Sequence, residues 1–459
     1  MTPKEKRTYI FEEMPVRQAV IKQVMPAVAS QMVALIYNLA DTYFVGMLND
    51  PRQTAAVTVV FPAFLMLTAI SNLFGVGGAS AIARSLGKKK PEEAGQISSI
   101  SFWFGLAGAL AYVLIFLCFA RPILSICGGK GETYEIARNY ARWVILIGGP
   151  ATILNVLLAN LVRAEGGAAS ASVGVSLGGV LNIILDPLLI LPRFMGLGVV
   201  GAGVATALSN MAAAIYFIAY IQLRRKTTVL SLSPGQLRYT SVHIRRILTI
   251  GFPSALQYAL TVVAVAAQSE FVSRYATEAV AGLGIAKKLD QLPMNFSIGV
   301  ASGLLPLLAY NHASGNQQRR KEAFRFGVGI AVGFALFCLA LYECFAPFFA
   351  SLFIGDPLTI HYAAGFLRRM VTAMPLMAIC YPTIIQFQAT GRARDSLICS
   401  VLRKGVLDIP LLFLMDRLFP LYGCMWVQPI VDIIALCVAG ILELRYKRRE
   451  AGGGLAPQA

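Results

Sequence analysis

The sequence predicts an all-α polytopic membrane protein, with twelve transmembrane helices in two six-helix bundles related by an internal pseudo-twofold repeat. Three observations support this prediction. Of the 459 residues, 57% are apolar and only 14% are charged, whereas soluble proteins carry roughly 25% charged residues. Twelve apolar stretches are each close to the roughly 20 residues that a helix needs to cross a bilayer. The two halves of the chain also resemble each other in sequence.

The twelve apolar stretches are all expected to be helices, because lipid offers no hydrogen-bond partner to an open backbone. They lie near residues 20–46, 55–83, 96–120, 143–162, 169–192, 199–222, 249–273, 280–310, 326–349, 370–390, 396–416 and 423–444. Assigning alternate connections to opposite sides places 26 Lys and Arg residues on the side of both termini and 10 on the other side. Because basic loops stay in the cytoplasm, we expect a multi-pass protein of the cell (inner) membrane with both termini cytoplasmic.

Four pairs of similar segments, separated by 224 to 229 residues, relate the two halves of the chain. One pair is VRAEGGAAS from Val162 and FQATGRARDS from Phe387, and another is GVLNIIL from Gly179 and GVLDIPL from Gly405. A tandem duplication of six helices explains these pairs. Because each half has an even number of spans, both copies share one topology, which predicts two bundles related by an axis along the membrane normal with a cavity between them. Many transporters are built from such repeats.

The longest connection on the predicted cytoplasmic side divides the chain into halves of nearly equal length. It carries six Lys and Arg residues. We therefore expect an N-terminal six-helix lobe over residues 1–222, a basic cytoplasmic linker over 223–247 and a C-terminal six-helix lobe over 248–459.

Composition and motifs exclude several classes of protein. The net charge of +17 would suggest a nucleic-acid partner in a soluble protein, but in a membrane protein it reflects basic cytoplasmic loops, so no nucleic-acid partner is expected. The chain has no Walker A motif, no CxxC pair and only three histidines. An enzyme, a bound cofactor and a structural metal site are therefore not expected. We expect a monomer surrounded by membrane lipid.

Acidic side chains inside the spans are the most informative residues, because a carboxylate in mid-membrane is costly and is a functional candidate by default. Three of them have a basic residue one helical turn away, which favours structural pairing: Glu270 with Arg274, Asp290 with Lys287, and Asp408 with Lys404. The other four have no such partner on their own helix: Asp41, Asp186, Glu343 and Asp432. Glu343 lies near an outer helix end, where it can reach water.

Asp41, Asp186 and Thr206 are expected at similar depth in the first half of the chain. At a rise of 1.5 Å per residue, all three lie roughly 8–10 Å below the outer boundary. Asn38 and Asn182 lie one turn deeper, on the same helix faces as the two carboxylates. Carboxylate, amide and hydroxyl oxygens together suit a proton or a small hard cation. A buried polar network that only holds helices together is the alternative interpretation.

Several motifs resemble those of the multidrug and toxic compound extrusion family. They are YNLADTYFVG from Tyr37, RAEG from Arg163, LNIILDPLLI from Leu181 and QATGRARDS from Gln388. The resemblance covers essentially the whole chain, including the twelve spans and the duplication. Taken together the motifs are quite specific, although each alone is weak.

The spacing of four polar residues resembles the branch of that family whose cation site lies in the N-terminal lobe. By this resemblance, Asp41 and Asp186 would bind the coupling proton or sodium ion, with Asn182 and Thr206 as neutral ligands. Pro26 resembles the proline at which the first span bends in this branch. A proline within a helix frees a carbonyl group and permits a kink.

The resemblance also implies a substrate cavity, for which the candidates are Tyr37, Asn38, Asn155, Gln257 and Asp432. The chain departs from another branch, which carries acids on spans 7 and 10: here the span-7 position resembles Gln257, and span 10 has no acid. Asp432 in span 12 is then the only deep carboxylate of the second half without a compensating charge, and its role is open.

The sequence therefore predicts an antiporter that uses protons or sodium ions to export amphipathic, often cationic, organic compounds such as drugs. A cationic drug in the same lobe would compete with the driving ion for negative charge, and this competition would couple the two fluxes. The alternative is a flippase for lipid-linked saccharides, which usually has more spans and a strongly cationic cavity. Only four Lys and Arg residues fall within spans here. A membrane-embedded enzyme is disfavoured because nucleophile–base and metal-ligand clusters are missing.

Overall fold

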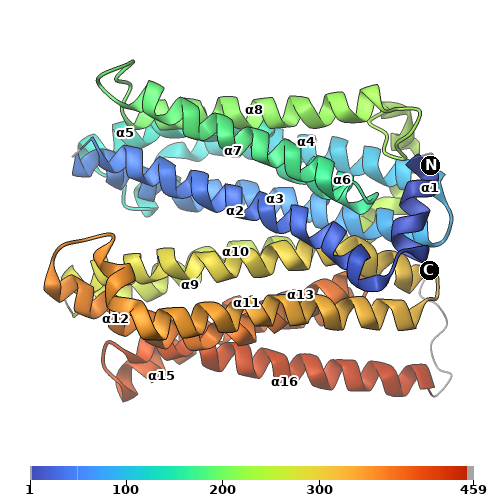
Figure 1. The fold of residues 1–459 in the computed structure, drawn as a ribbon. Coiled ribbons are helices and arrows are strands. Elements are labelled where there is room, and N and C mark those ends of the chain that lie inside the picture. Colours follow the sequence, from blue (N-terminus) through green and yellow to red (C-terminus); the bar gives the residue numbers. More distant parts are fainter. Residues whose placement is uncertain (1–2, 49, 276, 452–459) are drawn as a thin grey trace.

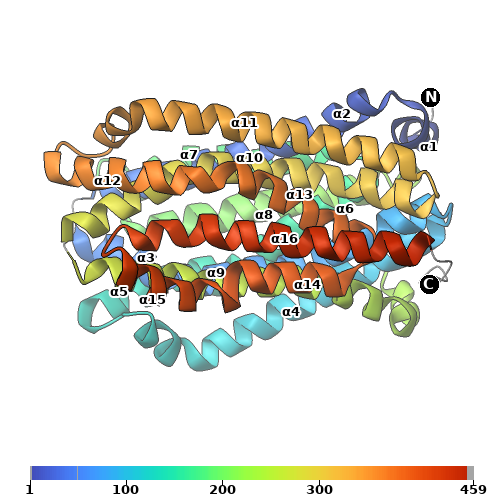
Figure 2. The same ribbon diagram turned by 90° about the horizontal axis from the view of Figure 1, so that it is seen from below.

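The computed structural model describes residues 3–48, 50–275 and 277–451, and this part of the chain is helical with short connections (Figure 1). The helices of the N-terminal half form one bundle, drawn from blue to green, and those of the C-terminal half form a second bundle beside it, drawn from yellow to red. Figure 2 shows that the long helices of both bundles run along one common direction. We refer to the bundles as the N-lobe and the C-lobe.

The N-lobe begins with a short segment at one end of the bundle and continues through six crossings. Its elements are α1 (Pro3–Thr8), the π-helical segment η1 (Tyr9–Glu13), α2 (Val16–Gly46), α3 (Pro51–Gly87), α4 (Pro91–Ile126), α5 (Gly131–Ala141), the π-helical segment η2 (Arg142–Ile147), α6 (Gly149–Ala164), α7 (Ala168–Ile190) and α8 (Val199–Leu223). The connection to the C-lobe contains the 3-10 turn η3 (Pro234–Tyr239). Helix α9 already begins at Thr240, within the segment expected to be a linker.

The C-lobe repeats the same order of crossings. Its elements are α9 (Thr240–Ser273), α10 (Thr277–Ala313), α11 (Gln317–Ser351), α12 (Pro357–Met370), the 3-10 turn η4 (Val371–Ala373), α13 (Met374–Ala389), α14 (Ala393–Val401), the π-helical segment η5 (Leu402–Val406), α15 (Asp408–Leu418) and α16 (Gly423–Ala451).

Twelve crossings account for these helices. Within the described residues, nine are long and apolar enough to span a membrane alone, and a tenth span is a pair of helices, Gly131–Ile147 and Gly149–Ala164, that meet at 46°. Helix α9 and the chain from α14 through η5 to α15 complete the twelve. The sequence predicts this last span as a helix over 396–416, but η5 interrupts it, with a non-helical backbone at Lys404 (φ −129°, ψ 17°).

The duplication is visible in the positions of the kinks. Helix α4 has a non-helical backbone at Phe119 (φ −116°, ψ 18°), just before Pro122. Helix α11 has the same distortion at Phe345 (φ −121°, ψ 21°), just before Pro347. A proline ring clashes with the preceding turn and removes one backbone hydrogen bond, which is a common cause of a kink. The two halves therefore share local geometry as well as topology.

A hydrogen bond between equivalent helices is also repeated. In the N-lobe, the guanidinium of Arg163 donates to the hydroxyl of Ser30 at 3.1 Å, which joins α6 to α2. In the C-lobe, the side-chain amide of Gln388 donates to the hydroxyl of Ser254 at 2.9 Å, which joins α13 to α9. The partners are 225 and 224 residues apart, so the residue types have changed while the contact between spans has been kept.

Glycines bring the two lobes into backbone contact along two pairs of helices. Helix α10 packs on α2, and a Cβ atom added to Gly303 would lie 2.6 Å from the Cα of Val24. Helix α3 packs on α9 in the equivalent way, where a Cβ on Gly77 would collide with the carbonyl of Ile247. We call these two contacts the glycine seam. Small residues allow helix backbones to approach closely in membranes, so the seam holds the lobes together over part of their length.

The N-terminal segment connects the two lobes at the end of the molecule where the described chain begins and ends (Figure 1). The buried guanidinium of Arg319, on α11 of the C-lobe, donates to the carbonyls of Phe11 and Met14 at 2.7 and 2.6 Å. The ring of Phe11 stacks on Tyr310 of α10, with centroids 4.8 Å apart. Phe11 also packs against Gly166 of the N-lobe. This end is therefore closed by contacts that cross between the lobes.

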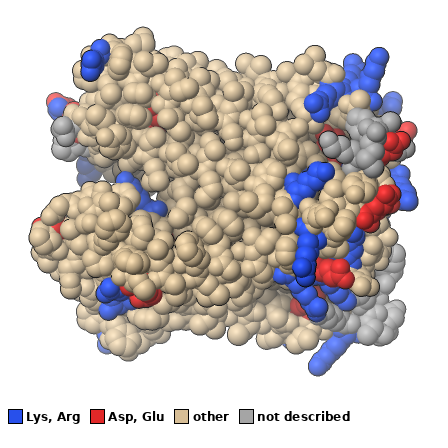
Figure 3. Space-filling view, in the orientation of Figure 1, with Lys and Arg blue, Asp and Glu red and all other residues tan. Residues whose placement is uncertain are grey.

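The opposite end is open. Figure 3 shows a cleft between the lobes at the end away from α1 and the end of α16. In the same view, Lys and Arg gather at the closed end, and the middle of the molecule carries almost no charge on its surface. A face with so little charge in its middle is what a protein presents to the hydrocarbon core of a bilayer.

Candidate functional site

The candidate site of the N-lobe begins with Asp41 on α2. Its side chain is partly buried, and one carboxylate oxygen, Oδ1, is fully buried and has no hydrogen-bond partner. Tyr37, one turn earlier on α2, interacts electrostatically with Asp41 and packs against Gly179 of α7. The structure therefore turns this part of α2 towards α7, which carries the second carboxylate.

Asp186 lies on α7 and is 0% exposed. Its Oδ1 accepts a hydrogen bond of 3.2 Å from the amide of Asn182, one turn earlier, while its Oδ2 is buried without a partner. The amide oxygen of Asn182 is also buried and unpartnered. Pro187 follows directly and has no N–H, so the carbonyl of Ile183 has no helical donor. Several oxygen atoms at or near Asp186 therefore lack a hydrogen-bond donor.

The two carboxylates lie close enough to interact electrostatically with each other. Tyr140 of α5 lies within electrostatic range of both of them, and its ring packs against Gly203 of α8. Within the described residues, neither Asp41 nor Asp186 takes part in an ion pair. Two neighbouring carboxylates without a cation attract a proton or a metal cation, because holding both charged in a low-dielectric site is unfavourable.

Tyr140 was not predicted from the sequence as a site residue. It lies in the segment before the predicted start of the fourth span at residue 143. Tyrosines close to a span boundary are common as anchors at the membrane surface, so its sequence position gave no reason to place it beside a carboxylate. The segment that carries Tyr140 meets α6 at an angle of 46°, so its direction differs from that of the rest of the span.

A second polar cluster joins α6 and α8. The amide of Asn155 donates to the amide oxygen of Asn210 at 2.9 Å, and Asn210 donates to the backbone carbonyl of Thr206 at 2.9 Å. This contact places Asn155 and Thr206 in one cluster and adds Asn210, which the sequence did not single out. Among the described residues, no hydrogen bond connects this cluster with Asp41 or Asp186. Tyr140 packs against Gly203, which lies one turn before Thr206 on α8.

The remaining candidates of the N-lobe and of α9 have local contacts. Asn38 is exposed, and its amide donates to the carbonyl of Ala34 on its own helix at 2.7 Å. Gln257 is partly buried on α9, and its backbone carbonyl accepts from Thr261. Helix α2 continues through Pro26 without an interruption of its helical conformation. None of these three residues contacts the carboxylates through a hydrogen bond among the described residues.

The prediction that Asp432 lacks a compensating charge is wrong. Arg403 donates through Nε to Asp432 Oδ1 at 2.7 Å, and both side chains are 0% exposed. The amide of Gln428 donates to the same oxygen at 2.9 Å, and Lys404 donates to Gln428 Oε1 at 2.7 Å. A search for cations one turn away on the same helix misses Arg403, because it lies on η5 and reaches Asp432 across to α16. A fully buried, paired carboxylate does not face a substrate cavity in this structure.

The ion pairs expected within single helices are also absent among the described residues. Asp290 and Lys287 interact electrostatically, as do Asp408 and Lys404, but neither pair is in ion-pair contact. The side chain of Glu270 lies outside the described residues, so its expected pairing with Arg274 has no structural description. The described part of the chain also holds no group of three or more His, Cys, Asp or Glu side chains arranged to bind a metal ion.

Comparisons with known proteins agree with this architecture. The sequence profile of the MatE family matches twice, over residues 26–188 and 253–414. The multidrug export protein MepA of Staphylococcus aureus is 32% identical over 448 residues, covering 97% of this chain and 97% of that protein. MepA of Staphylococcus haemolyticus is 31% identical over 447 residues, with the same coverage of both chains.

A solved structure described as the outward-facing conformation of a multidrug resistance MATE family transporter superposes with a TM-score of 0.90 at 25% identity. It covers 97% of this chain and 99% of that one. The two profile matches lie one in each lobe and together span more than half of the sequence. On the strength of these matches and of its two six-helix lobes, the chain belongs to the MATE family of membrane transporters.

Proposed function

We propose that this protein exports amphipathic, often cationic, organic compounds across the cell membrane in exchange for protons or sodium ions. The observation that carries the proposal is the pair of interacting carboxylates, Asp41 and Asp186, which have no cationic partner within the described residues of the N-lobe. The named relatives are multidrug export proteins, which supports organic compounds as the exported substrates.

The chemistry of exchange follows from the charge of this site. A proton or a sodium ion neutralises one carboxylate, with Asn182 and the carbonyl of Ile183, which lacks its i+4 donor at Pro187, as neutral oxygen ligands and Thr206 as a further candidate. A cationic drug that binds in the same lobe competes for the same negative charge. Ion and drug then favour different occupied states, and this difference in free energy couples their fluxes.

The direction of transport depends on orientation. The closed end of the molecule carries the larger share of the Lys and Arg visible in Figure 3, which supports a cytoplasmic location for both termini by the positive-inside rule. In this orientation the cleft opens outwards, where the driving ion is taken up. Cysteines introduced at Gly131 and at Gln318, in a variant without native cysteines, test this. An impermeant thiol reagent added outside should label only the first, and the reverse pattern would overturn the orientation.

Reconstituted protein tests the function itself. Proteoliposomes loaded with ethidium should export it when a pH gradient or a sodium gradient is imposed separately, and the effective gradient identifies the driving ion. Liposomes with Asp41→Asn protein at the same density are the control and should show only passive leakage. Export that proceeds equally well without either gradient would contradict an ion-coupled antiporter.

The alternative, a lipid-linked saccharide flippase, requires a cationic cavity that holds a diphosphate. The candidate site of the N-lobe is anionic, which favours cations over phosphates. Transport of a fluorescent diphosphate lipid by the proteoliposomes, together with no effect of Asp41→Asn on it, would favour the flippase.

A further inference from the structure

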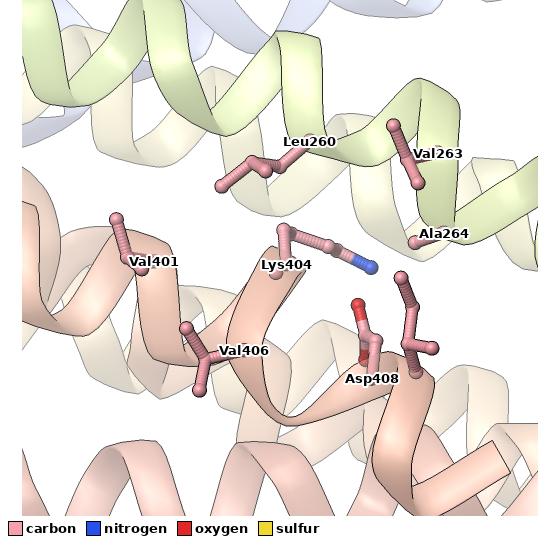
Figure 4. Close-up of a pocket in the computed structure, with 9 residues that line it drawn as sticks. Leu260, Val263, Ala264, Val401, Lys404, Val406 and Asp408 are labelled. Atoms are coloured by element: carbon pink, nitrogen blue, oxygen red, sulfur yellow. The ribbon is translucent and has the colours of Figure 1, made fainter. Parts of the chain in front are cut away.

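The C-lobe contains a cavity of about 260 Å³ where the eleventh span is interrupted (Figure 4). One wall is helix α9, and the other is formed by the end of α14, η5 and the start of α15. Its lining is apolar apart from two charged residues: Leu260, Val263, Ala264, Val401, Lys404, Gly405, Val406, Asp408 and Ile409. Val263 and Val406 are 50% and 59% exposed, so the cavity opens at the surface of the lobe. We call it the C-lobe pocket.

The interruption of the helix is what brings two opposite charges into this pocket. Lys404 has a non-helical backbone within η5, and Asp408 is the first residue of α15. Figure 4 shows the amine of Lys404 and the carboxylate of Asp408 both directed into the space between the helices. Gly405 between them lets η5 approach α9, since a Cβ there would lie 2.9 Å from Leu260.

Both charged groups have binding capacity left. The two side chains form no ion pair with each other among the described residues, and Asp408 Oδ2 is buried without a hydrogen-bond partner. The amine of Lys404 donates to Gln428, which leaves two of its three donor positions. The amine of Lys287, which interacts electrostatically with Lys404, is also buried and unpartnered. Charged groups without partners in an apolar membrane site are costly. A ligand that carries both an anionic and a cationic group therefore gains binding free energy from Lys404 and from Asp408.

The balance of charge around the pocket selects the kind of ligand. Three basic and three acidic side chains interact with one another there: Lys287, Arg403, Lys404, Asp290, Asp408 and Asp432. The cluster is therefore formally neutral. A ligand with a net charge would leave an excess of one sign in a low-dielectric region, whereas a ligand that carries one carboxylate and one ammonium group would keep the cluster neutral.

We propose that the C-lobe pocket binds amphipathic zwitterions, with the ligand carboxylate on Lys404, its ammonium group on Asp408 and its apolar body against α9. This extends the proposed export function, on which it rests, to a substrate class that the anionic N-lobe site alone would not favour. The pocket volume lies just below the roughly 300–1,000 Å³ of typical ligand sites, so a small ligand or the charged portion of a larger one fits.

Equilibrium binding to purified protein tests the proposal separately from transport. The probes are norfloxacin, which is zwitterionic near neutral pH, and its methyl ester, which keeps the ammonium group and lacks the carboxylate. Binding is followed by probe fluorescence in nanodiscs of phosphatidylglycerol. The wild-type protein should bind norfloxacin more tightly than the ester, and the ratio of the two dissociation constants is the quantity compared between variants.

Lys404→Met should weaken norfloxacin binding by about tenfold, the size of one lost charge-assisted hydrogen bond, and leave the ester unchanged. Lys404→Arg should keep the preference, and Asp408→Asn should weaken both probes. Lys288→Met removes a neighbouring lysine of α10 that does not line the pocket and should change neither. Equal loss of both probes in Lys404→Met, or no loss of norfloxacin, would overturn the proposal.

Two further arms separate the remaining explanations. Repeating the titration in phosphatidylethanolamine nanodiscs tests whether a zwitterionic lipid occupies the pocket. If the wild-type protein binds norfloxacin more weakly in this lipid, and Lys404→Met removes that difference between the lipids, the lipid is the occupant and the proposal is overturned. Gradient-driven ethidium export should persist in Lys404→Met and fail in Asp41→Asn, while Asp41→Asn keeps the ratio of the two probes. Failure of export in the wild type would count against the proposed function and leave the binding result independent.

Discussion

The two lobes have the same helical arrangement but opposite solutions for buried charge. In the N-lobe, neither Asp41 nor Asp186 forms an ion pair within the described residues, and several of the buried oxygens at this site have no hydrogen-bond donor. In the C-lobe, Asp432 is bound by Arg403, and every acid near it interacts with a base. One copy of the duplication therefore keeps an unsatisfied negative site, and the other has become a neutral network.

The divergence can be followed residue by residue through the repeat. Shifted by 226 or 227 positions, Asn182 corresponds to Asp408, Thr206 to Asp432, and Asp41 to Gln268. Gln268 donates to the backbone carbonyl of Cys424 at 3.2 Å, a structural contact. The C-lobe thus carries an amide where the first span of the N-lobe carries an acid, and it carries acids where the N-lobe has the neutral residues Asn182 and Thr206. Equivalent positions in a duplicated transporter can carry different chemistry on one scaffold.

The largest effect is expected from removing the charge of the N-lobe site. Asp41→Asn or Asp186→Asn should reduce gradient-driven export to the level of passive leakage, because an amide cannot take up the driving ion. The double variant should be no worse than either single variant, since residues acting as a unit are non-additive. Drug export from vesicles, corrected for protein abundance by immunoblot, measures this. Substantial export by both single variants would mean that the N-lobe site only holds helices together.

In the C-lobe, the corresponding change should affect stability. Arg403→Met leaves Asp432 buried without its partner, which should lower the free energy of unfolding by about 3–5 kcal/mol. Replacing both residues, as Arg403→Met with Asp432→Leu, should restore most of that loss, because a buried pair exchanged for apolar side chains is often neutral. Thermal unfolding in detergent provides the comparison. If the Arg403→Met protein were as stable as the wild type but had lost ion coupling, the buried pair of the C-lobe would serve transport and not stability, which would contradict the contrast between the lobes.

A smaller effect is expected at Tyr140, which lies within electrostatic range of both carboxylates. Tyr140→Phe removes one hydroxyl and keeps the ring against Gly203, so coupled export should fall by about fivefold, corresponding to roughly 1 kcal/mol for a polar interaction. Tyr134→Phe, on the same helix α5, is the matched control and should transport normally. Initial rates at saturating gradient give the readout, and equal rates in both variants would remove Tyr140 from the site.

The smallest effect is expected at Thr206, which offers one neutral hydroxyl. Thr206→Ala should lower coupled export by about twofold at most, because a single neutral ligand contributes little compared with a charge. The apparent affinity for the driving ion, from rates at graded ion concentrations, is the sensitive measure. A loss as complete as that of Asp41→Asn would place Thr206 at the centre of the ion site and extend the site to α8.

Sequence reasoning identified the features that depend on one helix or on the repeat. Span positions follow from runs of apolar residues, and the similar depth of Asp41 and Asp186 follows from their positions within their spans, while their assignment to one ion site rests on the family resemblance. Contacts that require the angle between helices were missed. Tyr140 lies near the carboxylates in a segment that meets α6 at a bend, and Arg403 reaches Asp432 from the interrupted eleventh span. Neither the bend nor the interruption follows from hydropathy, because average hydropathy marks where a span lies and not the angle at which its parts meet.

The glycine seam has a consequence for controlling the conformation of the protein. If the cleft between the lobes opens instead at the end that is closed here, the backbones of α2 and α10 must separate, and so must those of α3 and α9. A methyl group at Gly303 would act as a wedge only while they are in contact, since its Cβ would lie 2.6 Å from Val24. Every 1.4 kcal/mol of such strain changes the ratio of two states by a factor of about ten. Gly303→Ala therefore offers a way to trap the opposite state with one methyl group, and thus to obtain a transporter opened towards its termini without a ligand.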